Sequence, residues 1–282
     1  PLLVTWAPHL YTDVGWRNLQ RWQAVGDHIL LTPCTRVHRI LTRLALDNLF
    51  HPFQPFILGQ KVLAPRLAHE YSIPLVFYGE SEAEYGDPID HSPLRSPAYH
   101  TRSSKLRLSG LALDALPLDP GDLEMYLPVE TTNVQVHYLG YYLRWHPQDA
   151  YYYAVEHGGF ECSSERTPGT YSKYNSIDDK LDDLHYWTSW IKFGIGRATY
   201  DASQEIRNGE ITREEGVELV RRYDGEWPER FAPKVAQYLS PPGFQQIGNL
   251  KDYMLALAHR FRSPHLWDGD MPRYQVYMEK SE

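Results

Sequence analysis

Three carboxylates follow the apolar segment 75–78 in the first third of the chain. Glu80, Glu82 and Glu84 alternate along the sequence, so in an extended conformation their side chains lie on one face. Like charges at that spacing repel one another unless a cation lies among them, and carboxylate oxygens suit Mg²⁺ bound together with substrate phosphates. The preceding Gly79 allows a close backbone approach to such a ligand. The segment predicts a metal and phosphate site, although an acidic loop in solvent has the same composition.

A basic counterpart lies in the C-terminal half, in the sequence KFGIGR at residues 192–197. Lys192 offers a point charge and Arg197 a bidentate fork, and both suit phosphate. The two glycines between them bring the backbone close to a neighbour, which is either a ligand or a packed helix. Under the ligand interpretation, Lys192 and Arg197 are candidate catalytic residues together with Glu80 and Glu84.

Four aspartates at 178, 179, 182 and 183 fall within a segment that we expect to be one helix, capped by Ser176. A spacing of four residues puts Asp178 beside Asp182 and Asp179 beside Asp183. Such pairs can bind a metal or act as acid and base, and they also occur at helix N-termini for electrostatic reasons. Asp178 and Asp179 are candidate substrate-binding residues. The polar loop ahead of them supplies four more: Arg166, Tyr171, Lys173 and Tyr174.

Apolar, β-rich segments with helical patterns between them predict a parallel α/β sheet in the first third of the chain. The predicted strands cover residues 2–6, 28–32, 55–59 and 75–78. The clearest helical pattern is at 35–49, and residues 134–143 return to strand-like composition. We therefore expect an open, doubly wound sheet. Its ligands would lie beyond the carboxyl ends of the strands, at residues 7–9, 33–34, 59–61 and 79–80.

The second half of the chain is predicted to be helical. Pro147 suits a first helical turn, residues 212–215 have capping-box spacing, and Asn249 can cap a helix to about residue 261. We expect an α/β domain at residues 1–145 with a loop-rich excursion at 87–130, followed by a mainly helical substrate or partner lobe at 146–282.

Composition narrows the function classes. The net charge of −8 argues against a nucleic-acid partner bound through a general basic field. Two isolated cysteines indicate neither a disulfide framework nor a cysteine zinc site, and they fit a reducing cytoplasm. No apolar run approaches the roughly 18 residues of a membrane span. The 21 Tyr and eight Trp suit stacking on a sugar or nucleoside, although such rings also fill cores.

Five segments together carry a family resemblance: VTWAPHLYTDVGW at 4–16, HPFQPFILGQK at 51–61, PLVFYGESEAEYG at 74–86, ERTPGTYSKYNSIDD at 165–179, and residues 192–226. The chain resembles the N-acetyl sugar amidotransferases of lipopolysaccharide and surface-glycan biosynthesis, members of the PP-loop ATP pyrophosphatase superfamily. The resemblance implies an adenine nucleotide α-hydrolase-like fold. The S-G-G-x-D-S loop of that superfamily and a cysteine-rich segment are absent from this sequence, and we expect both, with the first βα unit, upstream of Pro1.

The resemblance also implies an activity. ATP with Mg²⁺ would activate the acetamido group of a nucleotide-linked sugar by adenylation, and ammonia would displace AMP to leave an acetamidino group. A glutaminase partner with an ammonia channel subunit would supply the ammonia in the cytoplasm. By topology, Thr5 and Trp6 would lie near adenine. Phosphates and metal would lie near Gly59, Gln60, Lys61, Gly79, Glu80, Glu82 and Glu84.

Two other interpretations are consistent with the sequence. A carbohydrate-processing hydrolase would use paired carboxylates such as Glu80 and Asp178 with aromatic stacking, and would turn over sugar without ATP. A non-catalytic subunit would bind a sugar nucleotide or the glutaminase without activating either. The absence of G-x-S-x-G, H-E-x-x-H and G-x-x-x-x-G-K-[ST] motifs argues against the commonest hydrolase, zincin and P-loop classes.

Overall fold

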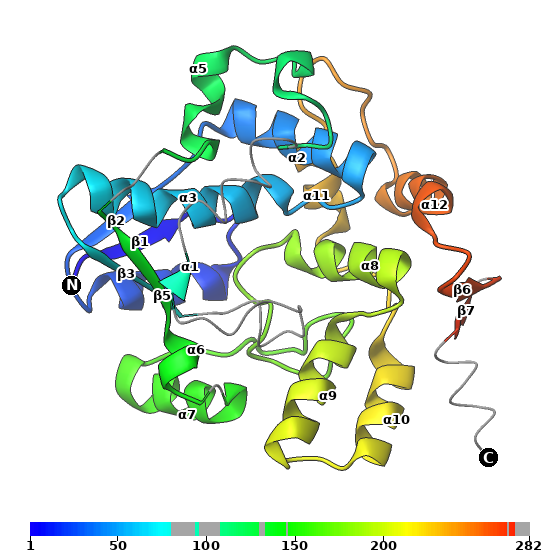
Figure 1. The fold of residues 1–282 in the computed structure, drawn as a ribbon. Coiled ribbons are helices and arrows are strands. Elements are labelled where there is room, and N and C mark those ends of the chain that lie inside the picture. The colour runs from blue at the N-terminus through cyan, green and yellow to red at the C-terminus, as the bar shows by residue number, and fades with distance from the viewer. Residues whose placement is uncertain (80–93, 96–107, 130–132, 145, 270, 274–282) are drawn as a thin grey trace.

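The computed structural model describes residues 1–79, 94–95, 108–129, 133–144, 146–269 and 271–273. The fold is mixed α/β, with short strands near the N-terminus and helices through the second half of the chain (Figure 1). The predicted carboxylates Glu80, Glu82 and Glu84 lie outside the described residues, and so do residues 87–93, 96–107 and 130 of the predicted excursion at 87–130.

Two parallel strand pairs form the β-structure of the N-terminal half. Strand β1 (Leu3–Trp6) pairs with β2 (His28–Leu31), and β3 (Leu75–Tyr78) pairs with β5 (Gln135–Tyr138). Strand β4 (Leu94–Arg95) adds to β5 in the antiparallel sense. Within the described part of the chain the two pairs belong to separate sheets, so the single doubly wound sheet that we expected is not present there.

The predicted strand at 55–59 is wrong, because these residues belong to helix α3 (Gln54–Glu70). The buried positions Pro55, Leu58, Gly59, Val62 and Leu63 have helical spacing. A short apolar run flanked by Pro and Gly reads equally well as a strand, which explains the error. Residues 59–61 are therefore not at the carboxyl end of a strand.

Other elements agree with the sequence. Helix α2 (Thr35–Leu49) has the predicted bounds, and α1 (Asp13–Gln23) lies between β1 and β2, where a helical pattern separates the predicted strands. Helix α7 (Pro147–Gly158) begins at Pro147, and α9 (Arg197–Asn208) ends at Asn208. The capping box of Thr212 and Glu215 begins α10 (Arg213–Tyr223), and Asn249 caps α12 (Leu250–Phe261).

Two predicted boundaries are corrected. The strand expected at 134–143 ends at Tyr138, where the four-residue helix α6 (Leu139–Tyr142) begins. The helix expected from Ser176 begins at Asp182 and is α8 (Asp182–Phe193). Ser176 has a positive φ of 55° and lies in an irregular segment, so it does not cap a helix.

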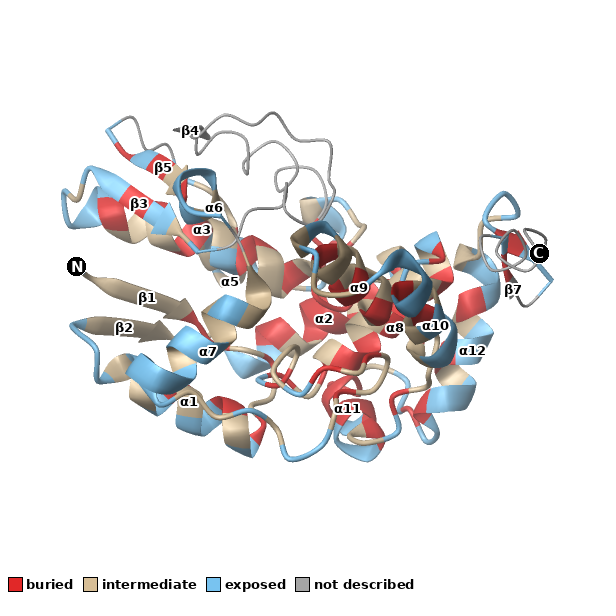
Figure 2. Cartoon of the chain, turned by 90° about the horizontal axis from the view of Figure 1, so that it is seen from below, coloured by how far each residue is buried: buried red, intermediate tan, exposed pale blue. Residues whose placement is uncertain are grey.

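Helix α8 lies at the centre of the C-terminal half. Its buried residues Leu184, Trp187 and Ile191 pack with α11 (Ala232–Tyr238), α12 and the end of α2 in the largest hydrophobic cluster of the described chain. Figure 2 shows buried residues concentrated in α2 and α8 and exposed faces on α10 and α12. Short elements complete the described chain: α5 (Pro120–Leu123), the 3-10 turns Leu113–Ala115 and Glu124–Tyr126, and the antiparallel strands β6 (Trp267–Asp268) and β7 (Met271–Pro272).

Candidate functional site

Residues 9–12, which follow the carboxyl end of β1, run beside residues 177–180 and join the two halves of the chain. The Thr12 amide donates to the Asp178 carbonyl at 2.9 Å, and the Lys180 amide donates to the Leu10 carbonyl at 2.9 Å. The Thr12 hydroxyl donates to the Ile177 carbonyl. We call residues 9–12 and 177–180 the seam. It lies beyond the end of β1, where the rule for parallel strands locates ligands.

Asp179 holds the seam together. Its carboxylate is 2 % exposed and accepts the His9 amide and the His9 Nδ1 proton, both at 2.7 Å. It also accepts the amides of Leu10 at 3.2 Å and Leu181 at 2.9 Å. A buried carboxylate with this many donors is committed to the fold. Its expected role in substrate binding stays a prediction, and the contacts seen here are structural.

Asp178 and Tyr11 lie on the same seam. Burial and the charges of Asp178 and Asp179 raise the pKa of Tyr11 to about 12, so its hydroxyl stays protonated. That hydroxyl is shielded from solvent and has no hydrogen-bond partner among the described residues. The Asp178 side chain, by contrast, is exposed. The seam therefore offers both a hydroxyl donor and a carboxylate to a ligand.

Helix α8 presents a polar face next to the seam. Asp182, His185, Ser189 and Lys192 are spaced by three or four residues, so they lie along one side of the helix. All four are partly buried, whereas Leu184, Trp187, Thr188 and Ile191 are buried in the core. We call these four polar residues the polar face of α8.

The acidic end of this face is Asp182. Burial and the neighbouring Asp178 charge raise the pKa of Asp182 to about 8, while the Ser176 hydroxyl and Arg197 oppose that rise. A carboxyl with such a pKa is protonated in most protein molecules at pH 7, so it can donate a proton or a hydrogen bond. The predicted proximity of Asp178 and Asp182 thus holds, although the helix begins only at Asp182.

The middle and basic end of the face hold imidazoles and an ammonium group. The His185 ring stacks on His51, with centroids 4.8 Å apart and planes inclined by 12°. Burial, and then the Lys192 charge, lower the pKa of His51 to about 3. Burial, and then the positive charges around it, lower the pKa of His185 well below its ordinary value. Lys192 donates to the Leu49 carbonyl at 3.0 Å, and burial lowers its pKa.

Arg197 approaches the same region from α9. Its guanidinium lies over the Tyr186 ring, 4.7 Å from the centroid, and pairs with Asp201 at 3.1 Å. The α9 N-terminus itself is closed by Asp224, which accepts the Gly196 amide at 3.0 Å and the Thr199 hydroxyl. A Cβ at Gly196 would lie 2.6 Å from an Asp224 carboxylate oxygen. The glycine-rich turn therefore accommodates a carboxylate of the chain itself, which supports the packing interpretation of the glycines.

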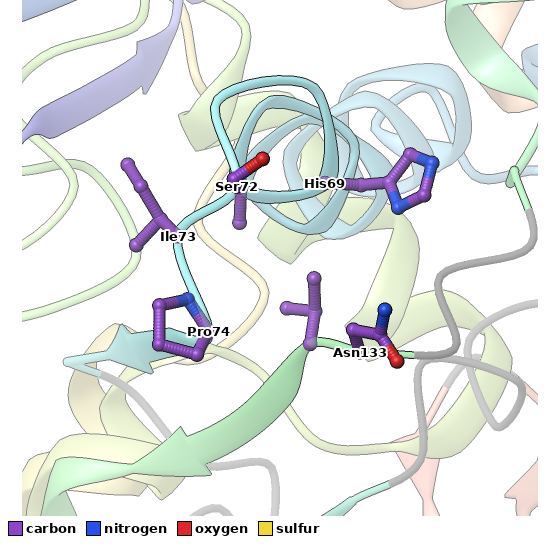
Figure 3. A pocket seen from close by; sticks show the side chains of 7 residues that line it. His69, Ser72, Ile73, Pro74 and Asn133 are labelled. Atoms are coloured by element: carbon purple, nitrogen blue, oxygen red, sulfur yellow. The ribbon is translucent and has the colours of Figure 1, made fainter.

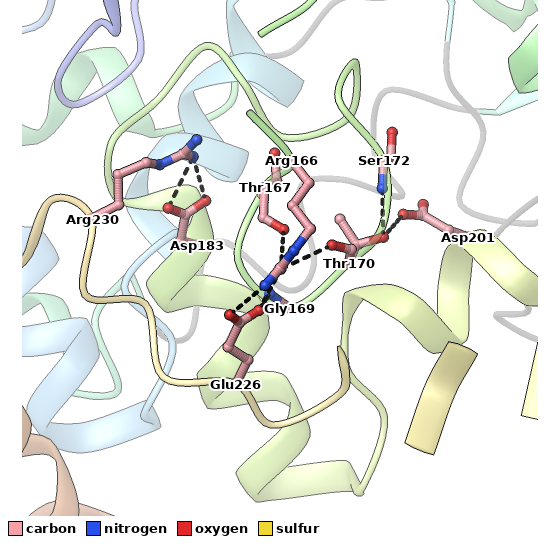
Figure 4. Close-up of polar contacts among 9 residues, drawn as sticks. All are labelled: Arg166, Thr167, Gly169, Thr170, Ser172, Asp183, Asp201, Glu226 and Arg230. Carbon is pink, nitrogen blue, oxygen red and sulfur yellow. Dashed lines mark hydrogen bonds and ion pairs between the residues drawn. The ribbon is translucent and has the colours of Figure 1, made fainter. Parts of the chain in front are cut away.

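The loop 165–175 is held against α9 and the segment after α10 by an ion pair and hydrogen bonds (Figure 4). Arg166 forms a bidentate pair with Glu226, with distances of 2.6 and 2.7 Å, and Glu226 also accepts the Gly169 amide at 2.8 Å. Thr170 donates to Asp201 at 2.5 Å. Arg230, in the same segment as Glu226, donates to Asp183 of α8 at 3.0 Å and so ties that segment to α8. These contacts fix the loop that leads into the seam.

The other candidates in this loop also have partners within the protein. Tyr171 donates to Glu205 at 2.7 Å, and Tyr174 stacks on Tyr151 with centroids 4.4 Å apart. Lys173 is exposed and donates to the Ser164 carbonyl. Each of the four loop candidates thus has a partner within the protein, and a role in substrate binding stays a prediction for each.

Comparison with known families adds a functional association. Residues 168–280 match the family model described as LPS biosynthesis protein WbpG-like, C-terminal domain. The match supports a role in lipopolysaccharide biosynthesis. It includes the polar face of α8 and Arg197, whereas the N-terminal side of the seam lies outside it. A search of curated proteins found no match. In the described part of the chain, no helix has the length and apolar character needed to cross a membrane.

The candidates expected near adenine and phosphate lie on β1 and α3, and not on the polar face of α8. Trp6 is 3 % exposed, and a Cβ on Gly59 would lie 2.3 Å from its ring, so Gly59 gives the indole its space in the core. Thr5 contacts His28, while the carbonyls of Gln60 and Lys61 accept the Tyr78 hydroxyl. The contacts described here are packing contacts, and adenine binding near Thr5 and Trp6 and phosphate binding near Gly59, Gln60 and Lys61 stay predictions.

Metal binding has no counterpart among the described residues. Gly79 is exposed, and the three glutamates that follow it are not described. The described part of the chain contains no group of three or more His, Cys, Asp or Glu side chains that could hold a metal ion. The Mg²⁺ site at Glu80, Glu82 and Glu84 therefore stays a prediction.

Sequence reasoning missed three residues at this site. His9 fell in a segment marked for inspection after the first strand, but its pairing with Asp179 was not anticipated. His51 and His185 were not singled out. The i, i+3 spacing of Asp182 and His185 is a signal that could have marked His185, whereas nothing local marks His51.

A separate pocket of about 300 Å³ lies between the end of α3 and the starts of β3 and β5 (Figure 3). Its lining includes His69, Ser72, Ile73, Pro74 and Asn133. Because this is the amino end of the parallel strands, it is opposite the edge where such sheets bind ligands. None of the predicted site residues lines it.

Proposed function

We propose that the protein is an ATP-dependent amidotransferase of lipopolysaccharide biosynthesis, which converts an acetamido group of a nucleotide-linked sugar to an acetamidino group. The observation that carries the proposal is the polar face of α8, inside the region that matches the family model. The face has a carboxyl with a raised pKa at one end and an ammonium group at the other. Ten residues of helix separate these ends by about 15 Å.

The acidic end fits amide chemistry. In the proposed reaction nitrogen from ammonia replaces the amide oxygen, and that oxygen leaves in AMP. A neutral Asp182 carboxyl can donate a hydrogen bond to the amide oxygen, and an ionised Asp178 can accept a proton from the attacking nitrogen. The buried Tyr11 hydroxyl is a third group available to the sugar. Acid and base would thus lie side by side at the seam.

The basic end fits phosphate. Lys192 and Arg197 carry positive charge on the two helices that meet beside His185, and electrostatic stabilisation of developing phosphate charge is a large contribution to such reactions. ATP, when bound, would supply the adenylyl group that turns the amide oxygen into part of a good leaving group, AMP. Mg²⁺ held by Glu80, Glu82 and Glu84, and a glutaminase partner that supplies ammonia, are parts of the same proposal.

The proposal is tested by incubating the protein with ATP, Mg²⁺, ammonium chloride and a panel of nucleotide-linked N-acetyl sugars. We expect AMP and pyrophosphate, followed by ³¹P NMR, to form only when the correct sugar is present, with matching amidine in the mass spectrum. Asp182→Asn should lower the rate at least about 100-fold, the usual range for loss of an acid or base. Glu218→Gln, at an exposed ion pair on α10, is the matched control and should keep the rate.

The same assay separates the alternative functions. The carboxyl pair of Asp178 and Asp182 also suits a carbohydrate-processing hydrolase, in which one carboxyl is protonated and the other ionised. Sugar release without ATP would support that hydrolase and contradict the amidotransferase. Binding of a sugar nucleotide with no turnover under any condition would support a non-catalytic subunit instead.

A further inference from the structure

A pair of orphaned imidazole nitrogens lies at the middle of the polar face of α8, where His51 stacks on His185. The His51 and His185 rings stack at 4.8 Å, and the Nδ1 atoms of both are shielded from solvent. Neither Nδ1 has a hydrogen-bond partner among the described residues. A buried polar atom without a partner costs roughly 1–3 kcal/mol, and nearly all such atoms in folded proteins bind water or a ligand. Two adjacent orphans therefore point to a ligand position.

The surrounding charge selects the kind of ligand. Lys192 lowers the pKa of both imidazoles, and Arg197 also acts on His185. Asp182 lies only one turn from His185, about 5 Å along the helix axis, but its raised pKa keeps that carboxyl largely neutral at pH 7. A cation would be repelled by this local potential, whereas an anion would be attracted and could accept the proton of each ring nitrogen. The chemistry thus favours an anion with several acceptor oxygens.

The backbone brings the three groups together. Helix α2 ends at Leu49, and the next residue, Phe50, has a φ of 51° that turns the chain sharply, so that His51 faces α8. Lys192 binds the carbonyl of Leu49 in this same turn, which holds the turn against α8. Helical side chains tilt toward the N-terminus, so the Lys192 ammonium reaches back toward His185, two turns earlier. An ammonium group has three donors, and Leu49 is the hydrogen-bond partner of one of them.

We propose that His51, His185 and Lys192 form a binding site for a phosphoryl group. The inference rests on the proposed function, because the phosphoryl group would be that of the nucleotide sugar or that of ATP. Lys192 supplies the charge, and the two imidazoles supply neutral donors in a fixed, stacked geometry. The site fixes one end of a substrate while the carboxyls at the seam act on the other end.

The direct test is NMR of protein labelled with ¹⁵N-histidine, titrated with inorganic pyrophosphate at constant pH. We expect the Nδ1 signals of His51 and His185 to shift together and to saturate, while the signal of the exposed His265 stays unchanged. Unchanged His51 and His185 signals throughout the titration would overturn the proposal, and this measurement needs no variant.

Variants then test the contribution of each group. Lys192→Met should weaken pyrophosphate binding at least about tenfold, the order expected for loss of a hydrogen bond to a charged group. Lys251→Met, at an exposed lysine on α12, is the matched control and should bind normally. His51→Phe keeps a stacking ring but removes the nitrogen, and should also weaken binding. Equal affinities in all three variants would refute the site.

Two further titrations distinguish the sources of the phosphoryl group. UDP that shifts both imidazoles while ATP does not would identify the sugar nucleotide, and the reverse would identify ATP. The inference and the proposed function fail separately. Amidine formation without these shifts would contradict the phosphoryl site alone, whereas pyrophosphate binding in a protein without turnover would contradict the activity alone.

Discussion

Four aspartates within six residues have different environments in the fold. Asp179 accepts hydrogen bonds from the seam, and Asp183 pairs with Arg230 at 3.0 Å. Asp178 is exposed, while Asp182 is partly buried beside it and has a raised pKa. The side chains are chemically identical, so burial and neighbouring charge alone separate the structural pair from the candidate acid and base.

The raised pKa of Asp182 predicts a specific pH dependence of stability. Below about pH 4 its carboxyl is protonated in the folded and the unfolded chain alike. Between pH 4 and 8 the unfolded chain ionises while the folded chain stays largely neutral, so the free energy of unfolding falls over this range and levels off above pH 8. Because the side chain keeps partial solvent contact, we expect a loss of about 1–3 kcal/mol.

Urea unfolding at several pH values, compared between the wild type and Asp182→Asn, measures this effect. The variant cannot titrate at residue 182, so its stability relative to the wild type should rise from pH 4 to 8. Asp114→Asn, at an exposed carboxyl, should follow the wild type. Parallel curves for the wild type and Asp182→Asn would show that the carboxyl is not perturbed.

At the scale of elements, residues 224–230 connect α10 to three neighbours. Asp224 caps α9, Glu226 binds Arg166 and Gly169, and Arg230 binds Asp183 on α8. Gly225 lies between them with a φ of 83°, and a Cβ there would be 2.5 Å from the Trp190 ring. Because Glu226 binds the loop 165–175 and Arg230 binds α8, this segment fixes the loop relative to α8 and thereby positions the seam.

We predict that Glu226→Ala loosens this loop without unfolding the protein. Arg166 and Glu226 are about one-third exposed, so the expected loss in the free energy of unfolding is only about 1–2 kcal/mol. The Gly169 amide loses its acceptor and should exchange with solvent at least tenfold faster in a hydrogen-exchange measurement. Glu218→Ala, at the exposed pair with Arg221, should change neither quantity. Normal protection of Gly169 in Glu226→Ala would contradict the role assigned to this pair.

Local signals explain which elements the sequence predicted. Helix α2 shows a regular apolar period, and α10 and α12 carry side-chain caps, so their bounds were predictable. Helix α3 was missed at its start because the apolar run at 55–59 also suits a strand. Its Gly59 is required by Trp6, a contact from a distant strand that no local pattern reveals.

The same contrast between local signals and distant contacts explains which site residues the sequence indicated and which it did not. Asp178 with Asp182, and Lys192 with Arg197, are near each other in sequence, so spacing alone indicated their possible association. His9 and its partner Asp179 are 170 residues apart. His51 likewise meets His185 only because α2 packs against α8. Contacts that depend on tertiary packing were not accessible from a single sequence.

For the whole molecule, the seam is a buried polar connection between the segment that follows β1 and the C-terminal half of the chain. We predict that Asp179→Asn lowers the free energy of unfolding by about 2–4 kcal/mol, because it leaves several buried donors poorly matched. Thermal and urea unfolding measure the loss. Asp27→Asn, at an exposed residue beside β2, should stay within about 0.5 kcal/mol of the wild type. A similar small change in Asp179→Asn would mean that the seam does not join the halves.

The central claim is that substrates bind along the polar face of α8 and the adjoining seam. The most direct test is hydrogen-exchange mass spectrometry of the protein, with and without ATP and a panel of nucleotide-linked N-acetyl sugars. We predict ligand-dependent protection at residues 177–192 and in the turn at 49–53, with α12 unchanged. Protection confined to the pocket around Ile73 and Val134, or to α12, would contradict this location of the site.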